Sequence, residues 1–175
     1  MNHDTQPGQT VETPIAPFFK LHAYAMILLR AQGLPCVFFG DLYGILGSRP
    51  EAPACEGMLP SLILVRKLFA YGEQKDYLDC PTSVGWTRLG TWDRKEGCAV
   101  VMSVWQPARK KMFVGLDKAG QAWSDVLGNW TEDVVIDRKG FGDFGCSERS
   151  TSVFVNVGAS RKVGFPPAFS TKIYE

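Results

Sequence analysis

The sequence lacks the long apolar run and the excess of one charge that mark several large classes of protein. None of its apolar stretches approaches the roughly 18 residues that a membrane-spanning helix needs. Lysine and arginine number 19 against 18 aspartate and glutamate residues, so the formal net charge is only +1. Such a balance creates no strong field toward polyanions. We therefore expect no nucleic acid and no membrane among the partners.

Histidine is scarce, and the cysteines follow no recognisable pairing pattern. Two histidines and five cysteines are present, and no two cysteines form a Cys-x-x-Cys pair. An odd number of scattered cysteines predicts free thiols rather than a zinc site or a disulfide framework. No basic-then-apolar leader is visible. These features favour a cytoplasmic protein over a secreted one.

The first part of the chain has helical periodicity around one short apolar run. Residues 14–29 carry apolar side chains at helical spacing, and Gly33 with Pro35 follows as a stop signal. The run "PCVFF" (35–39) is typical of a parallel strand buried on both faces, and residues 58–71 predict a second helix. Only one such strand is present, so it has no neighbouring strands to pair with. The helix–strand–helix segment is therefore expected to expose large apolar faces. Either the chain assembles with another copy or it is the end of a longer protein.

Beyond about residue 71 the apolar pattern changes to a period of two. Short β-branched and aromatic runs alternate with Gly, Asn and Asp turn signals. This spacing predicts an antiparallel Greek-key sandwich. The runs are "SVGWTRLG", "GCAVVMSV", "KKMFVGLD", "QAWSDVLG", "EDVVIDRKG" and "TSVFVNVG". The last residues, 159–175, show no clear period and are expected to form an extension.

Several motifs from Asn2 to about Val155 occur in a fixed order: "NHDTQPGQ", "GLPCVFFGDLYG", "VGWTR", "KMFVGLDKAGQAW" and "DVLGNWTEDVVID". In this order the chain resembles the C-terminal portion of an α-amylase of the α-glucan-acting glycoside hydrolase family, of the bacterial liquefying type with its intracellular fungal relatives. The resemblance implies the end of a (β/α)8 barrel over residues 1–71 and an antiparallel domain C over 72–158. The expected fold is therefore an α/β barrel remnant of helix, buried parallel strand and helix, followed by an all-β Greek-key sandwich.

The resemblance also implies a glycosidase mechanism of which this chain carries only part. Retaining hydrolysis uses a carboxylate nucleophile and a carboxylic acid roughly 5 Å apart. In the family both precede the His-Asp motif, so they would lie upstream of residue 1. Asp4 matches the third carboxylate, which stabilises the transition state, and His3 matches a neighbouring sugar-binding histidine. The resemblance thus implies hydrolysis of internal α-1,4 bonds of starch or glycogen by a parent enzyme, with this chain inactive by itself.

Other readings of these residues stay open. Taken alone, His3 and Asp4 could form a solvated tail. "GDLYG" (40–44) would border the substrate cleft through Asp41 and Tyr43, or it could be a turn that joins two elements. His22 is expected to be a packing residue rather than a ligand, because it lacks the partners that a metal requires.

The five tryptophans and the calcium sites of the family need separate treatment. The indoles could form a carbohydrate platform, but strand positions favour the sandwich core, with Trp105 and Trp130 as the expected exposed exceptions. The family often carries calcium, yet Pro81, Thr82 and Val104 stand where a bridging site would fall, and none offers a carboxylate. We expect no cofactor in this chain, with calcium confined to the full-length parent.

The expected partners are the α-glucan substrate, including maltooligosaccharides, and a missing N-terminal part of the barrel. The alternative to the enzyme hypothesis is a non-catalytic α-glucan-binding or interaction module built on the β domain. An exposed aromatic pair would support it.

Overall fold

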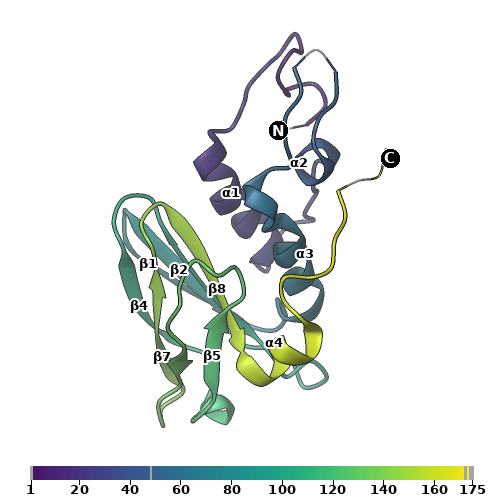
Figure 1. Cartoon of the computed structure of the whole chain (residues 1–175). Coiled ribbons are helices and arrows are strands. Elements are labelled where there is room, and N and C mark those ends of the chain that lie inside the picture. Colours follow the sequence, from purple (N-terminus) through teal and green to yellow (C-terminus); the bar gives the residue numbers. More distant parts are fainter. Residues whose placement is uncertain (1, 48, 172, 174–175) are drawn as a thin grey trace.

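Three layers make up the fold in a computed structural model, which describes residues 2–47, 49–171 and 173. Helices form one outer layer, a six-stranded sheet the middle layer, and a two-stranded sheet the other outer layer (Figure 1). The helical elements are α1 (Pro17–Leu29), α2 (Phe39–Tyr43), η1 (Cys55–Gly57), α3 (Leu59–Leu68), η2 (Leu116–Lys118) and α4 (Val157–Val163). The strands are β1 (Gln74–Cys80), β2 (Ser83–Arg88), β3 (Cys98–Ser103), β4 (Ala108–Phe113), β5 (Ala122–Asp125), β6 (Val134–Val135), β7 (Phe141–Cys146) and β8 (Ser150–Asn156).

Both sheets are antiparallel, as the period-two pattern predicts. The larger sheet has the order β1-β2-β3-β8-β5-β6, and β4 pairs with β7 in the smaller one. The last strand therefore returns to lie between β3 and β5. Val100 of β3 stands opposite Trp86 of β2 on one side and Val153 of β8 on the other. The antiparallel β domain is confirmed.

The six-stranded sheet separates two hydrophobic cores. Val100 and Met102 of β3 face the helical layer, whereas Ala99 and Val101 face the β4–β7 sheet. Because successive side chains of a strand point to opposite faces, β3 is buried along its whole length. Its continuous apolar run thus marks the strand that serves both cores.

The two predicted helices are confirmed as α1 and α3. Pro17 stands in the first turn of α1, where a missing N–H costs nothing. After Leu29 the chain becomes extended at Arg30. In α3, Leu59, Leu62 and Val65 are buried at helical spacing against α1 and the sheet. Both helices are shorter than the sequence pattern indicated.

The buried strand predicted over residues 35–39 is wrong for this structure. Residues 34–38 belong to no strand or helix, pair with no strand of the described chain, and continue into α2 at Phe39. Leu34 is 97% exposed, and Cys36 is exposed as well. A parallel strand requires a neighbouring strand to accept its hydrogen bonds, and no described segment supplies one.

The outer face of α1 exposes apolar side chains, as expected. Phe19, Met26 and Ile27 are 42%, 39% and 44% exposed, while Leu21, Leu28 and Leu29 on the inner face are buried. Apolar residues therefore lie on both the inner and the outer face of α1. A helix of this kind is ordinarily buried on all sides.

Candidate functional site

The segment around His3 and Asp4 forms a turn closed by hydrogen bonds to Asn2. The Asn2 side-chain oxygen accepts hydrogen bonds from the backbone N–H of Asp4 (3.0 Å) and of Thr5 (3.1 Å). Within this turn His3 Nε2 lies 3.1 Å from Asp4 Oδ1, and the two side chains are 81% and 63% exposed. Both groups are therefore accessible to a ligand.

An ion pair connects this segment to the loop that follows α2. Glu12 Oε2 accepts hydrogen bonds from the Gly8 N–H (2.9 Å) and from the Arg49 guanidinium (3.0 Å). The Thr13 N–H closes the segment on the Thr5 carbonyl at 3.0 Å. The N-terminal turns and the loop after α2 thus lie at one end of α1 (Figure 1).

Asp41 is buried and both of its carboxylate oxygens have protein partners. Its exposure is 3%. Lys20 Nζ donates to Oδ1 at 2.8 Å, and the Tyr24 hydroxyl donates to Oδ2 at 2.6 Å. Burial, then the hydrogen bond to Asp41, raises the pKa of Tyr24. Since the Asp41 carbonyl also accepts from the Ala54 N–H at 2.8 Å, Asp41 orients the whole loop.

Sequence reasoning missed Lys20 and Tyr24 as partners of Asp41. Both interrupt an apolar helix on its buried face. A lysine is almost never buried without a partner, so its position among apolar neighbours was the available signal. The pattern could not name the partner, because Asp41 is 21 residues away.

Tyr43 lies half-buried at the edge of the same loop. Its ring centroid is 4.7 Å from that of Phe39 and 5.5 Å from that of Phe169, which belongs to the C-terminal extension. Gly44 follows with φ of +90°, and a side chain there would meet the Glu51 carbonyl. Among the described residues, neither His3 nor Asp4 forms a hydrogen bond with Asp41 or Tyr43. The structure brings the two predicted pairs to one end of α1 without joining them.

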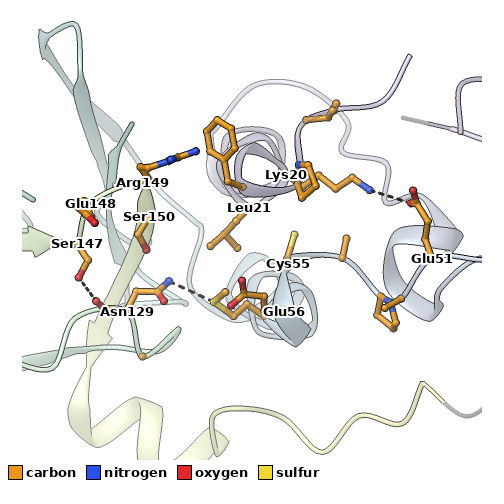
Figure 2. Close-up of a pocket in the computed structure, with 18 of the residues that line it drawn as sticks. Lys20, Leu21, Glu51, Cys55, Glu56, Asn129, Ser147, Glu148, Arg149 and Ser150 are labelled. Carbon is orange, nitrogen blue, oxygen red and sulfur yellow. Dashed lines mark hydrogen bonds and ion pairs between the residues drawn. The ribbon is translucent and has the colours of Figure 1, made fainter. Parts of the chain in front are cut away.

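A cleft of about 1020 Å³ opens between the start of α1, η1 and the turn at 147–150. Figure 2 shows Arg149 and Lys20 on the walls of this cleft. The Arg149 guanidinium lies 4.4 Å from the ring centroid of Phe18, and Lys20 lies 3.8 Å from Glu51. Burial raises the pKa of the Cys55 thiol in this cleft to about 12, so it supplies no thiolate.

The described residues form no metal cluster. No group of three or more His, Cys, Asp or Glu side chains in this part of the chain could hold a metal ion. His22 is 1% exposed, and its Nε2 lies 2.9 Å from the Ser103 carbonyl, so it packs between α1 and β3 as expected. None of the helices described is long and apolar enough to cross a membrane.

The tryptophans divide into buried and exposed groups. Trp86 and Trp123 are fully buried in the two cores. Trp130 is half-buried, with Arg109 4.9 Å above its ring, so the expectation that it is exposed was only partly right. Trp105 is 68% exposed, as predicted, and Trp92, which sequence reasoning did not single out, is 89% exposed.

Comparison with known proteins supplies the family context. Residues 99–155 match the family model described as "Alpha-amylase C-terminal". The chain is 43% identical over 156 residues to the alpha-amylase of Bacillus licheniformis, covering 88% of this chain and 30% of that relative. It is 44% identical over 156 residues to the glucan 1,4-alpha-maltohexaosidase of Bacillus sp. (strain 707), covering 89% of this chain and 30% of that protein. The cytoplasmic alpha-amylase of Escherichia coli (strain K12) is 42% identical over 163 residues, which are 88% of this chain and 32% of the relative.

A solved structure has a similar fold. The gamma-CGTase from alkalophilic Bacillus clarkii matches with a TM-score of 0.58 and 17% identity, over 89% of this chain and 25% of that one. At this identity the likeness concerns the fold alone. The chain thus spans about 30% of the length of the curated relatives that it matches.

Proposed function

Since residues 99–155 match the model of the α-amylase C-terminal domain family, we propose that this chain is the C-terminal portion of an α-amylase. The parent enzyme would hydrolyse internal α-1,4-glucosidic bonds of starch or glycogen with retention. The observation that carries the proposal is the 43% identity to an alpha-amylase over 156 residues, which extends well beyond the matched domain.

In this proposal Asp4 is the carboxylate that stabilises the transition state. An ionised carboxylate that accepts hydrogen bonds from sugar hydroxyls gains strength as positive charge develops on the ring. His3 donates to a hydroxyl of the same sugar. The exposure of both side chains supports these roles, because a ligand can reach them from the solvent.

Asp41 and Tyr43 are proposed to border the substrate cleft in different ways. Tyr43 offers a half-buried ring to a sugar face. Asp41, whose oxygens are taken by Lys20 and Tyr24, fixes the position of the loop that carries Tyr43. Tyr43 thus contributes binding area for the sugar, and Asp41 holds the loop in place.

The β domain is proposed to hold the helical layer in place through the C-terminal end of α1. Arg88 of β2 donates to the Leu29 carbonyl at the end of α1 (3.3 Å) and to the Gly72 carbonyl (3.1 Å). The Trp86 indole N–H also points to the Leu29 carbonyl, at 3.4 Å. Unsatisfied carbonyls at a helix end need such partners. The β domain therefore holds α1, and through Lys20 it holds the loop of Asp41.

We further propose that the 175 residues alone do not hydrolyse starch. Both reacting carboxylates are required for the double displacement, and one stabilising carboxylate cannot replace them. Calcium, where the full-length parent binds it, would be held by other segments. A cytoplasmic location is part of the same proposal.

The test compares the purified chain with its Asp4→Ala variant on soluble starch, with release of reducing ends as the measurement. We expect both to match a buffer blank. The same substitution in an enzyme restored by co-expression with the rest of the barrel should lower kcat by about a hundred- to a thousandfold, by analogy with the loss of other groups that stabilise transition-state charge. Hydrolysis by the 175 residues that depends on Asp4 would overturn the proposal of inactivity, and an active restored enzyme indifferent to Asp4→Ala would overturn the assigned role.

A second candidate function is supported by one observation. Trp92 presents an almost fully exposed indole on the β domain. This favours carbohydrate binding by the β domain itself, either beside the enzymatic role or in place of it.

A further inference from the structure

An exposed indole lines a groove near the start of β3, at the opposite end of that strand from the turn at 147–150 that borders the cleft of Figure 2. Trp92 is 89% exposed in the connection between β2 and β3. The groove beside it has a volume of about 700 Å³, and Lys95, Glu96, Asp117, Lys118 and Gln121 are among its lining residues. This volume lies within the range of known small-ligand sites.

The turn that carries Trp92 is fixed by hydrogen bonds. The Thr91 hydroxyl donates to Asp93 Oδ1 at 2.7 Å and accepts from the Arg94 N–H at 3.2 Å. The Thr91 N–H donates to the Arg94 carbonyl at 2.8 Å. These bonds enclose Trp92 between two anchored residues. Its exposure is therefore a feature of an ordered turn and not of a loose loop.

Arg94 attaches this turn to the helical layer. Its guanidinium lies 4.1 Å from the ring centroid of Tyr71 and donates to the Lys67 carbonyl at 3.1 Å. A cation held over an aromatic ring and bonded to a helix carbonyl has little freedom. A ligand that stacks on the indole would thus lose little free energy to ordering the protein.

Polar groups on the groove floor are oriented before any ligand binds. Gln121 Oε1 accepts from the Trp123 indole N–H (3.1 Å) and from Asn156 Nδ2 (3.0 Å). Because both partners are donors, the amide orientation is set and the Gln121 NH₂ group remains available to donate. Lys118 is only 3% exposed and donates to the Leu89 carbonyl at 3.0 Å.

The charges that line the groove cancel. Lys95 and Lys118 are opposed by Glu96 and Asp117, and the Asp117 carboxylate lies 3.3 Å from Lys118 Nζ. A charged ligand gains nothing from such a lining. A neutral ligand with an apolar face and many hydroxyls suits it best, since the indole covers the face and the fixed donors and acceptors bind the hydroxyls.

We propose that the groove beside Trp92 is an auxiliary binding site for an α-glucan chain. The choice of an α-glucan rests on the proposed function, whereas the choice of a neutral sugar rests on the groove. The site is remote from the loop of Asp41. Arg94 of the Trp92 turn binds the last turn of α3, whereas the loop of Asp41 adjoins η1, which precedes the first turn of α3. A helix of this length separates them by about 15 Å. The groove would tether the chain to a polymer without occupying the cleft.

Affinity electrophoresis of the 175-residue chain in native gels containing glycogen tests the proposal. The test variant is Trp92→Ala, and the matched control is Trp105→Ala, which removes another exposed indole beyond the opposite end of β3. We expect Trp92→Ala to weaken the apparent affinity on the order of tenfold or more. Trp105→Ala should migrate like the parent chain. Equal thermal melting curves for both variants will show that the fold is intact.

Three results would overturn the proposal: no retardation of the parent chain, unchanged retardation of Trp92→Ala, or equal retardation by a β-linked glucan gel. The outcome is separable from the enzymatic proposal. If the restored enzyme hydrolyses maltooligosaccharides while Trp92→Ala leaves glycogen binding unchanged, only the auxiliary site fails. If glycogen binding needs Trp92 but no enzyme can be restored, only the enzymatic proposal fails.

Discussion

The ammonium group of Lys20 lies 2.8 Å from Asp41 Oδ1, and the side chains are only 10% and 4% exposed. The pair links α1 to the loop that carries Tyr43. Tyr24, one turn along the same helix, donates to the other Asp41 oxygen at 2.6 Å. Two positions on one helix therefore hold one carboxylate, and the loop has a single preferred placement.

Replacing Lys20 by methionine should destabilise the chain by about 3–5 kcal/mol, because it leaves a buried carboxylate without its counter-charge. The free energy of unfolding in urea measures this change. Lys67→Met is the matched control, since Lys67 is exposed on α3, and it should change stability by less than about 0.5 kcal/mol. A Lys20→Met variant as stable as the control would show that the ion pair does not anchor the loop.

Asp125 supports a second prediction about stability. Its carboxylate accepts four backbone hydrogen bonds: Leu127 (3.0 Å) and Val153 (2.8 Å) donate to Oδ1, and Asn129 (2.9 Å) and Trp130 (3.0 Å) donate to Oδ2. Asp125→Ala should cost about 3 kcal/mol or more, because each buried donor left unpaired is expensive. Asp125→Asn retains one side-chain oxygen, so its stability should fall between those of the parent chain and of Asp125→Ala.

The control for Asp125 is Asp133→Ala at an exposed position of the same region. Unfolding followed by circular dichroism reports the stability, and amide hydrogen exchange at Val153 reports the specific bond. If Asp125→Ala unfolds at the same urea concentration as Asp133→Ala, the four bonds contribute no net stability.

The β domain could be predicted from the sequence because its strands repeat a simple alternation between turn residues. β1 and β7 were not among the predicted runs. β1 is an edge strand whose polar residues show no apolar alternation. β7 contains Gly142 and Gly145, where a side chain would meet the rings of Phe144 and Trp130, so packing requires the glycines that weaken the strand pattern.

The site was less predictable because its contacts are remote in sequence. The position of Asp41 after an apolar run was evident, but its burial depends on Lys20 and Tyr24. Trp92 was one of five tryptophans, and only the fold shows that its turn projects from the sheet while Trp86, six residues earlier, fills the core. The alternation of β2 explains Trp86, whereas no periodicity governs a turn.

The exposed apolar face of α1 should bind hydrophobic dyes and promote self-association of the chain. Met26 and Ile27 lie on this face. Changing both to serine should lower the fluorescence of bound anilinonaphthalene sulfonate at least about twofold, because the contiguous patch is interrupted. Leu78→Ser, at a 58% exposed site on β1, is the control. Fluorescence that falls equally in the control, or in neither variant, would contradict the role of α1.

Cys80 should be the most reactive thiol near neutral pH. Hydrogen bonds from Ser83 and Thr82 lower its pKa to about 6, and its sulfur lies 3.4 Å from the Thr82 hydroxyl. Since the thiolate is the nucleophile, alkylation by iodoacetamide should rise between about pH 5 and 7 and then level off, rather than rise through about 8.5 as for an ordinary thiol. Burial raises the pKa of Cys98 to about 12, so Cys98 should stay unmodified while the chain is folded.

Peptide mapping after timed alkylation gives the alkylation rate at each cysteine. Thr82→Val should move the pH midpoint of Cys80 alkylation upward, because it removes one hydrogen-bond donor to the sulfur. A Cys80 rate that still climbs above pH 8 in the parent chain would show that these hydrogen bonds do not stabilise its thiolate.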